Sequence, residues 1–156
     1  MTASKNCYDL LKHYEGCKLT AYLDVAKVPT IGYGNTMYLD GRRVKEGDTI
    51  TQTQAELLLP SILEKFEISV RKALKVNITQ QQYDAIVCLT YNIGIGNFVG
   101  SSLLRKINAS DPLASDSFLL WNKAKINGVL QPVKGLTYRR QSEKYLYDNG
   151  VVKWFN

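Results

Sequence analysis

Two carboxylates and a hydroxyl follow one another near the start of the chain. Glu15 is followed nine residues later by Asp24, and Thr30 comes six residues after Asp24. Glycoside hydrolysis needs two carboxyl groups in different protonation states, because one protonates the leaving oxygen while the other stays ionised and directs water. The same spacing fits a solvated glutamate at a helix end and a solvated aspartate in a turn. Spacing alone therefore leaves both interpretations open.

The elements around these residues favour bringing them together. A short helix is predicted over about 4–14. The next segment, about 17–51, is rich in Thr, Tyr, Val and Gly and contains turn residues, which predicts two or three short antiparallel strands. A helix end, a hairpin loop and a returning strand would then carry Glu15, Asp24 and Thr30 toward one gap.

The rest of the chain has a helical pattern. Thr53-x-x-Glu56 and Thr79-x-x-Gln82 predict capping boxes at the starts of two helices. Pro60 predicts a break between a short helix and a longer one. The helix that follows Thr79 is apolar almost all round, so we expect it to be the buried centre of a helical lobe. Further helices are predicted over about 101–107, about 112–125 and about 136–147, the last after a turn at Asn127-Gly128.

These elements predict one α+β domain over residues 1–156. A small antiparallel β lobe would occupy about 15–59, and a larger all-α lobe about 1–14 and 60–156. A long helix would join the lobes, with a cleft between them where a ligand could bind. The last residues include Trp154 and Phe155. We expect this tail to dock on the helical lobe, with contact to a cell wall or a membrane as the alternative.

Composition excludes several classes of protein. Hydrophobic residues make up 45% and charged residues 22% of the 156, which argues against a disordered chain. No apolar run is long enough to span a membrane. The net charge of +6 fits either attraction to a polyanion or a solvated basic surface. One histidine and three cysteines without ligand spacing predict no metal and no cofactor, and no nucleic-acid-binding motif is present.

Three blocks of sequence carry a resemblance to a known family. They read EGCKLTAYLDVAKVPTIGYG from Glu15, DAIVCLTYNIGIGNFVGSSLLR from Asp84 and GLTYRRQSE from Gly135. In this order they resemble the phage-type lysozymes, the endolysins of glycoside hydrolase family 24. The resemblance spans nearly the whole chain. It implies a lysozyme-like fold and cleavage of the β-1,4 bond between N-acetylmuramic acid and N-acetylglucosamine in bacterial peptidoglycan.

The resemblance also implies roles for individual residues. Glu15 matches the general acid, Asp24 the carboxylate that positions or activates water, and Thr30 the hydroxyl that holds this water. Inverting enzymes need room for the water, so their two carboxyl groups lie about 6.5–9.5 Å apart. Arg139 would pair with Glu15 and orient it, with Arg140 an equal candidate by spacing and an ordinary surface arginine as the alternative. Residues that match glycan-contacting positions, each with an ordinary structural role as the alternative, are Gly34, Asn92, Ser102 and Asn122.

Two positions depart from the family pattern. Lys27 stands where relatives often have glycine, so a turn that needs positive φ at this position would hold a lysine in a strained conformation. Asn35 stands where many relatives have histidine. The first departure puts the geometry of the hairpin turn in question, and neither touches the three residues matched to catalysis.

The resemblance implies a lysis enzyme whose partner is the glycan strand of peptidoglycan. We expect a monomer that neither binds nucleic acid nor inserts stably into a membrane. Since the first residues show no export signal, we expect synthesis in the host cytoplasm and action in the periplasm after a separate holin has permeabilised the membrane. One alternative is a lytic transglycosylase on a related fold, which would not need the Asp24 and Thr30 pair. The other is a catalytically inactive module that binds the wall or nucleic acid.

Overall fold

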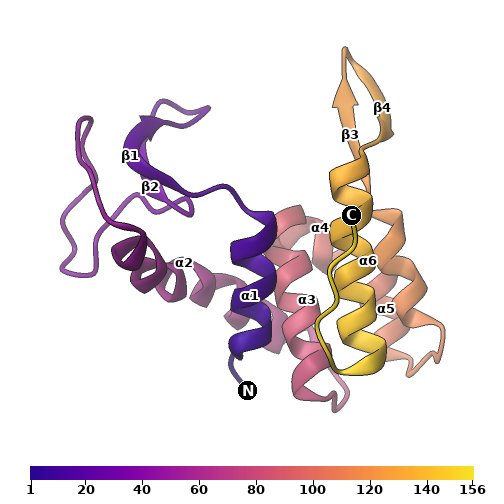
Figure 1. Ribbon diagram of the computed structural model, residues 1–156. Helices are drawn as coiled ribbons and strands as arrows, with labels where there is room; N and C mark the ends of the chain where they lie inside the picture. The colour runs from indigo at the N-terminus through magenta and orange to yellow at the C-terminus, as the bar shows by residue number, and fades with distance from the viewer. The chain divides into compact units, whose positions relative to one another are not determined.

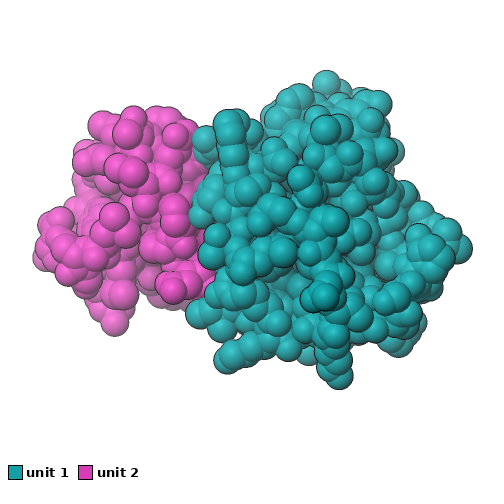
Figure 2. Space-filling model, turned by 90° about the horizontal axis from the view of Figure 1, so that it is seen from below, with its two compact units in different colours: residues 1–13, 66–156 teal, residues 14–65 magenta.

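The computed structural model describes residues 1–156 and confirms the predicted α+β class. Two small antiparallel sheets accompany a larger helical part. The chain divides into two compact units, residues 1–13 with 66–156 and residues 14–65, coloured separately in Figure 2. Helix α2, Gln52–Ala73, contributes its first part to the smaller unit and its second part to the larger one. None of the helices is both long enough and apolar enough to cross a bilayer.

The unit 14–65 is built on a single hairpin. Strand β1 (Lys18–Leu23) pairs antiparallel with β2 (Pro29–Gly32), and Tyr22 lies opposite Thr30. After β2 the chain makes isolated bridges in place of a third strand, one of them joining Thr49 to Thr20 of β1. The small apolar core of this unit consists of Ile31, Val44 and Leu58, with Ala21, Tyr38 and Ile50 packed against it.

The predicted break at Pro60 is wrong, because α2 continues through this residue. Pro60 is exposed, and the apolar side chains on both sides of it, among them Leu59 and Leu63, are buried on one face. The carbonyl of Leu58 accepts hydrogen bonds from the Ser61 hydroxyl at 2.7 Å and the Asn35 amide at 3.1 Å, so side chains satisfy the backbone beside the proline.

The capping box of α2 lies two residues earlier than predicted. Gln54 N donates to Thr51 Oγ1 at 3.1 Å, and Thr51 N donates to Gln54 Oε1 at 2.8 Å. The predicted box of Thr53 and Glu56 is therefore wrong.

The larger unit is organised around helix α3, Gln80–Ile93, which begins at the predicted Thr79–Gln82 capping box. Its residues 83–90 are all buried, which confirms its predicted central place. Removing one large apolar side chain such as Ile86 or Leu89 from water contributes about 1.5–3 kcal/mol. Figure 1 shows α3 among the other helices of this unit, which are α1 (Lys5–Tyr14), α4 (Ile95–Val99), α5 (Ser102–Asn108) and α6 (Lys134–Asn149).

The helix predicted over about 112–125 is wrong. A 3-10 helix, η1, spans Ala114–Leu120, and a hairpin of β3 (Lys123–Ile126) and β4 (Val129–Pro132) follows it. Asn127 and Gly128 have φ values of 52° and 79°, as in the tight hairpin turn that matches the twist of two strands. The turn residues were identified correctly, but the strands on either side of them were not. The hairpin projects from the start of α6 in Figure 1.

The C-terminal tail docks on the larger unit, as predicted. The Trp154 ring stacks on His13 of α1, with ring centroids 4.1 Å apart and an interplanar angle of 22°. The Phe155 ring meets Tyr145 of α6 edge-on, with centroids 6.1 Å apart. The tail therefore connects the last turn of α1 to α6.

Candidate active site

Asp24 occupies the turn between β1 and β2. Its carbonyl accepts a hydrogen bond from Lys27 N at 2.9 Å, and its own N–H donates to the Val28 carbonyl at 3.1 Å. Its side chain closes the same turn, because Oδ1 accepts from Ala26 N at 2.8 Å and Val28 N at 2.9 Å. Two amides thus fix one carboxylate oxygen and leave Oδ2 for another partner.

Lys27 adopts the left-handed conformation in this turn, with φ of 59°. This is the conformation that a glycine at this position would adopt without steric strain. The sequence comparison with the family pattern therefore identified a real constraint. The turn tolerates the lysine, whose side chain is exposed.

Thr30 follows the turn as the second residue of β2, where it lies opposite Tyr22, and it is 3% exposed. Its hydroxyl donates to the Val28 carbonyl at 2.8 Å. The Asp24 carboxylate accepts from the N–H of the same residue. Asp24 and Thr30 therefore hold the two polar groups of Val28, and the structure brings these two predicted residues together.

Glu15 directly follows the last residue of α1 and is half-buried. It belongs to the same compact unit as Asp24 and Thr30, and β1 begins three residues after it. Its predicted place at a helix end is confirmed. Its convergence with Asp24 and Thr30 on one bond stays a prediction.

Gly34 lies in the tight loop that follows β2. Ile31 N donates to the Asn35 carbonyl at 2.8 Å and Asn35 N donates to the Ile31 carbonyl at 2.9 Å, so the chain reverses within this loop. Gly34 has φ of 106°, which favours glycine whether or not a sugar is bound. Asn35 is 4% exposed, and its amide group donates to the Leu58 carbonyl and the Ser61 hydroxyl at 3.1 and 3.2 Å. Asn35 therefore anchors the loop to α2.

The other three predicted glycan contacts lie in the larger unit. Asn92 is exposed near the end of α3, and Ser102 is half-buried at the first position of α5. Asn122 donates through Nδ2 to Thr137 Oγ1 at 3.1 Å and accepts at its carbonyl from Val133 N at 2.8 Å. Asn122 thus holds the base of the β3–β4 hairpin against α6, and its contact with a sugar stays a prediction.

Arg139 and Arg140 share a buried carboxylate that was not singled out from the sequence. Glu143 is completely buried and accepts from Arg139 Nε at 3.1 Å and from Arg140 Nη2 at 2.9 Å, while Arg140 Nε lies 2.7 Å from its other oxygen. Arg139 Nη2 also donates to the Cys88 carbonyl at 3.2 Å. These residues are three and four apart on α6, a spacing that could have revealed the pairing. Glu143 and the Cys88 carbonyl therefore hold the Arg139 guanidinium in place. The pairing of Arg139 with Glu15 stays a prediction.

No group of three metal-ligating side chains is gathered anywhere in residues 1–156. The chemistry available at the hairpin is that of the Asp24 carboxylate and the Thr30 hydroxyl, which suits proton transfer and the orientation of water.

Comparison with known proteins identifies the family of this chain. The family described as phage lysozyme matches residues 12–143. The chain belongs to the phage lysozyme family. It is 44% identical over 141 residues to an endolysin of Acyrthosiphon pisum secondary endosymbiont phage 1, covering 90% of this chain and 93% of the relative. It is 40% identical over 149 residues to an endolysin of Salmonella phage P22, covering 94% and 98% of the two chains.

A solved structure also has this fold. The endolysin from Escherichia coli O157:H7 phage FAHEc1 superposes with a TM-score of 0.84 at 40% identity, covering 98% of this chain and 97% of the other. The lysozyme-like fold predicted from the sequence is thereby confirmed. As a member of the phage lysozyme family, the chain is a glycoside hydrolase of the muramidase class.

Proposed function

We propose that this phage lysozyme hydrolyses the β-1,4 bond between N-acetylmuramic acid and N-acetylglucosamine in peptidoglycan and so releases phage progeny by host lysis. Glu15 acts as general acid, and Asp24 with Thr30 positions the attacking water. Family membership and the endolysin relatives support the overall activity. The hydrogen bonds of the hairpin support the division of roles.

One observation carries this assignment. The only hydroxyl hydrogen of Thr30 is donated to the Val28 carbonyl, so toward any other partner Oγ1 acts as an acceptor. Asp24 Oδ1 is occupied by two amides, and the other carboxylate oxygen, Oδ2, is likewise an acceptor. A water between these two atoms must direct both hydrogens at them. Its lone pairs then point away from the hairpin, which is the orientation that attack on a sugar carbon requires.

The reaction proceeds by a single displacement. Glu15 gives its proton to the glycosidic oxygen, and the bond from this oxygen to the anomeric carbon breaks. The water forms the new bond to that carbon from the opposite face, and its proton passes to Asp24. The configuration at the anomeric carbon is inverted, as expected where a water stands between carboxylate and sugar.

The remaining predicted residues act on binding and orientation. Gly34, Asn92, Ser102 and Asn122 contact the glycan strand, and Arg139 orients Glu15. The half-buried or exposed positions of all four contacts leave them accessible to a sugar. The contacts of Arg139 with Glu143 and Cys88 support its role in orienting Glu15, because they fix the position of its guanidinium group.

Substitution of each catalytic residue tests the mechanism. Glu15→Gln should lower the rate of reducing-end release from peptidoglycan by about 10²–10⁴-fold, the usual contribution of a general acid. Glu46→Gln, at an exposed glutamate of the same unit, is the matched control and should be unchanged. Retention of more than a few per cent of the wild-type rate by Glu15→Gln would remove Glu15 from its role.

The water site is tested separately. Thr30→Val keeps the shape of the side chain but removes the acceptor, and it should lower kcat by about tenfold, the equivalent of one hydrogen bond of about 1.4 kcal/mol. Thr30→Ser should retain most of the rate. If Thr30→Val were as active as Thr30→Ser, the hydroxyl would have no part in holding water.

The products discriminate between the alternatives. Hydrolysis by inversion gives a reducing sugar that is first formed in the α configuration, which proton NMR detects before mutarotation. A lytic transglycosylase would give an anhydro sugar lighter by one water in mass spectrometry. Failure to clear chloroform-treated Gram-negative cells at any enzyme concentration would favour the inactive wall-binding module.

We further propose that the enzyme works as a monomer and reaches the wall after a separate holin has opened the membrane. Expression of this chain alone should leave cells intact until chloroform or a co-expressed holin is added. Rapid lysis without either would overturn the dependence on a holin, and a dimer mass in light scattering would overturn the monomer.

A further inference from the structure

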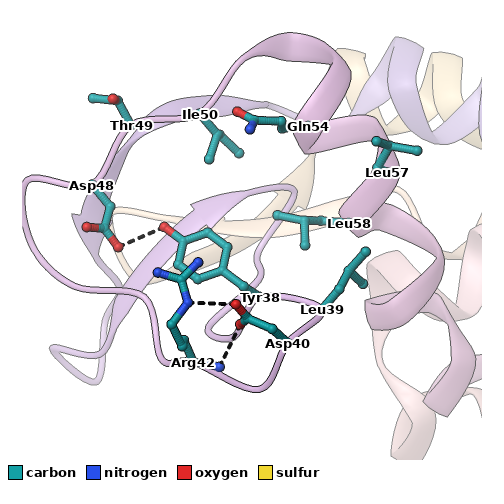
Figure 3. A pocket seen from close by; sticks show the side chains of 10 residues that line it. All are labelled: Tyr38, Leu39, Asp40, Arg42, Asp48, Thr49, Ile50, Gln54, Leu57 and Leu58. Atoms are coloured by element: carbon teal, nitrogen blue, oxygen red, sulfur yellow. Dashed lines mark hydrogen bonds and ion pairs between the residues drawn. The ribbon is translucent and has the colours of Figure 1, made fainter.

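The unit 14–65 contains a pocket whose lining includes none of the predicted site residues (Figure 3). Its volume is about 470 Å³, in the range that holds small ligands. One wall is aliphatic and contains Ile50, Leu57 and Leu58, and the opposite side is polar. The pocket opens beside the small core of this unit.

The polar side presents the largely exposed cation of Arg42. Arg42 Nε contacts Asp40 Oδ2 at 2.7 Å, and its guanidinium carbon lies 5.3 Å from the centre of the Tyr38 ring. The stack is visible in Figure 3. Since Nε is the atom used for this contact, the Nη groups remain as donors for a ligand. A guanidinium with two such donors suits a carboxylate.

A second charged group of opposite sign lies beside it. Asp48 Oδ2 accepts from the Tyr38 hydroxyl at 2.7 Å and from Lys45 N at 2.9 Å, which leaves Oδ1 free to accept from a ligand. The hydrogen bond from the Lys45 amide, together with that from Tyr38, holds the pKa of Asp48 below its ordinary value. The pKa of Asp40 is lowered by its hydrogen bonds from Arg42. Both carboxylates are therefore ionised at neutral pH.

The charges select the class of ligand. One guanidinium with two carboxylates gives the pocket a net charge of −1, which disfavours phosphates, nucleotides and other polyanions. A small molecule that bears a carboxylate and an amine would match Arg42 and Asp48. The aliphatic wall adds a requirement for hydrocarbon, because Leu39 and Leu57 are 69% and 62% exposed without a ligand.

Backbone hydrogen bonds connect the pocket wall with strand β1, whose end leads to Asp24. Ile50 N donates to the Leu19 carbonyl and Ala21 N donates to the Asp48 carbonyl, both at 2.9 Å. The pocket wall therefore lies alongside β1. Asp24 follows Ala21 by three residues, which corresponds to about 10 Å along an extended strand.

We propose that this pocket binds the peptide stem of peptidoglycan. Stems of the diamino-acid type carry carboxylates, a free amine and short aliphatic groups, and they are attached to the muramic sugar next to the scissile bond. A stem carboxylate is held by Arg42, the amine by Asp48, and the hydrocarbon chain by Leu39 and Leu57. This proposal rests on the proposed action on peptidoglycan, and it names a site for a part of the polymer that the hairpin does not engage.

Binding is tested without catalysis. The full chain is labelled with ¹⁵N and titrated with the free tetrapeptide L-alanyl-γ-D-glutamyl-diaminopimelyl-D-alanine, and separately with chitotriose as a glycan probe. The peptide should shift the amide resonances of residues 38–42 and 48–58, whereas chitotriose should not. Because this readout needs no turnover, it stays informative if the proposed catalytic roles fail.

Two neighbouring arginines give a matched comparison. Arg42→Ala should weaken binding of the tetrapeptide about tenfold, while Arg43→Ala, at an exposed arginine outside the pocket, should leave it unchanged. Arg42 is largely exposed, so the fold should be retained, and circular dichroism checks this. With active enzyme, Arg42→Ala should raise KM about tenfold on intact peptidoglycan and leave KM unchanged on glycan strands stripped of peptide by an amidase.

Several results would overturn the proposal. They are an absence of peptide-induced shifts in the pocket up to ~10 mM, an equal loss of affinity in Arg42→Ala and Arg43→Ala, or an equal rise of KM on intact and stripped glycan. Shifts in the pocket caused by chitotriose alone would assign it to sugar and overturn it as well.

Discussion

The buried ionic cluster of α6 allows a quantitative prediction. Glu143 is 0% exposed and is the carboxylate partner of Arg139 and Arg140, which are 3% and 0% exposed. Glu143→Gln keeps the shape of the side chain but leaves two buried guanidinium groups without an anion. Removal of one partner from a buried ion pair costs about 3–5 kcal/mol. At about 2–4 °C per kcal/mol for a chain of this length, Tm should fall by about 6–20 °C.

Thermal denaturation followed by circular dichroism measures this shift. Glu64→Gln, an exposed glutamate on α2, is the control and should change Tm by less than about 2 °C. Arg140→Met combined with Glu143→Leu should be less destabilised than Glu143→Leu alone, because the double change removes both charges of the closest pair. A Tm for Glu143→Gln within about 2 °C of wild type would refute the argument that this carboxylate neutralises the two arginines.

Three further predictions concern the turn, the thiols and a tyrosine. Lys27→Gly should raise the free energy of unfolding, measured by urea denaturation, by up to about 1 kcal/mol. The substitution relieves about 1–2 kcal/mol of left-handed strain, which exceeds the entropy that a glycine loses on folding. A loss of stability would show that Lys27 is unstrained. Burial raises the pKa of Cys7 and Cys88, and it also raises the pKa of Cys17, but Cys17 is only half-buried. At pH 8 a disulfide reagent should therefore titrate only Cys17 in the native protein and all three thiols after denaturation; fast reaction of two or more native thiols would contradict this. Burial and the hydrogen bond to the Asp48 carboxylate raise the pKa of Tyr38 from 10 to about 12, so this tyrosine ionises first in the unfolded form and the free energy of unfolding should fall between about pH 10 and 12. The fall should be smaller in Tyr38→Phe, and the 295 nm difference titration of the two proteins gives the pKa itself.

Local patterns were identified correctly where the deciding contacts are local. The Thr79–Gln82 capping box uses atoms three residues apart, and its residue types predict it fully. At the start of α2 two such boxes overlap, and the sequence does not say that Thr51 with Gln54 wins over Thr53 with Glu56. Alongside the observed box, Ala55 is buried and Leu58 packs in the small core, contacts that the sequence of the two boxes does not contain. The continuity of α2 through Pro60 is decided in the same way, by the packing of apolar side chains on both sides of the proline.

The same distinction between local and distant contacts applies to the candidate site. The turn that links Asp24 to Thr30 is local, and its residue pattern sufficed to predict a hairpin. The strands on either side of Asn127-Gly128 were missed because Lys123–Ile126 also has a composition compatible with a helix. The pocket of the unit 14–65 could not be predicted, since its walls come from a loop, a bridge to β1 and the first turns of α2. Only the folded chain places those three segments together.

The end of helix α1, where the proposed general acid Glu15 follows, illustrates how a short motif depends on distant parts of the chain. Glu15 directly follows the last residue of α1 and lies two residues after His13. The His13 ring is stacked on Trp154 from the C-terminal tail. The same tail reaches α6, where the Lys153 ammonium lies 5.2 Å from the centre of the Tyr145 ring. The helix end that positions Glu15 is thus fixed by residues about 140 positions away. A motif of twenty residues can therefore predict candidate catalytic groups, but the ring contacts next to Glu15 involve the last six residues of the chain.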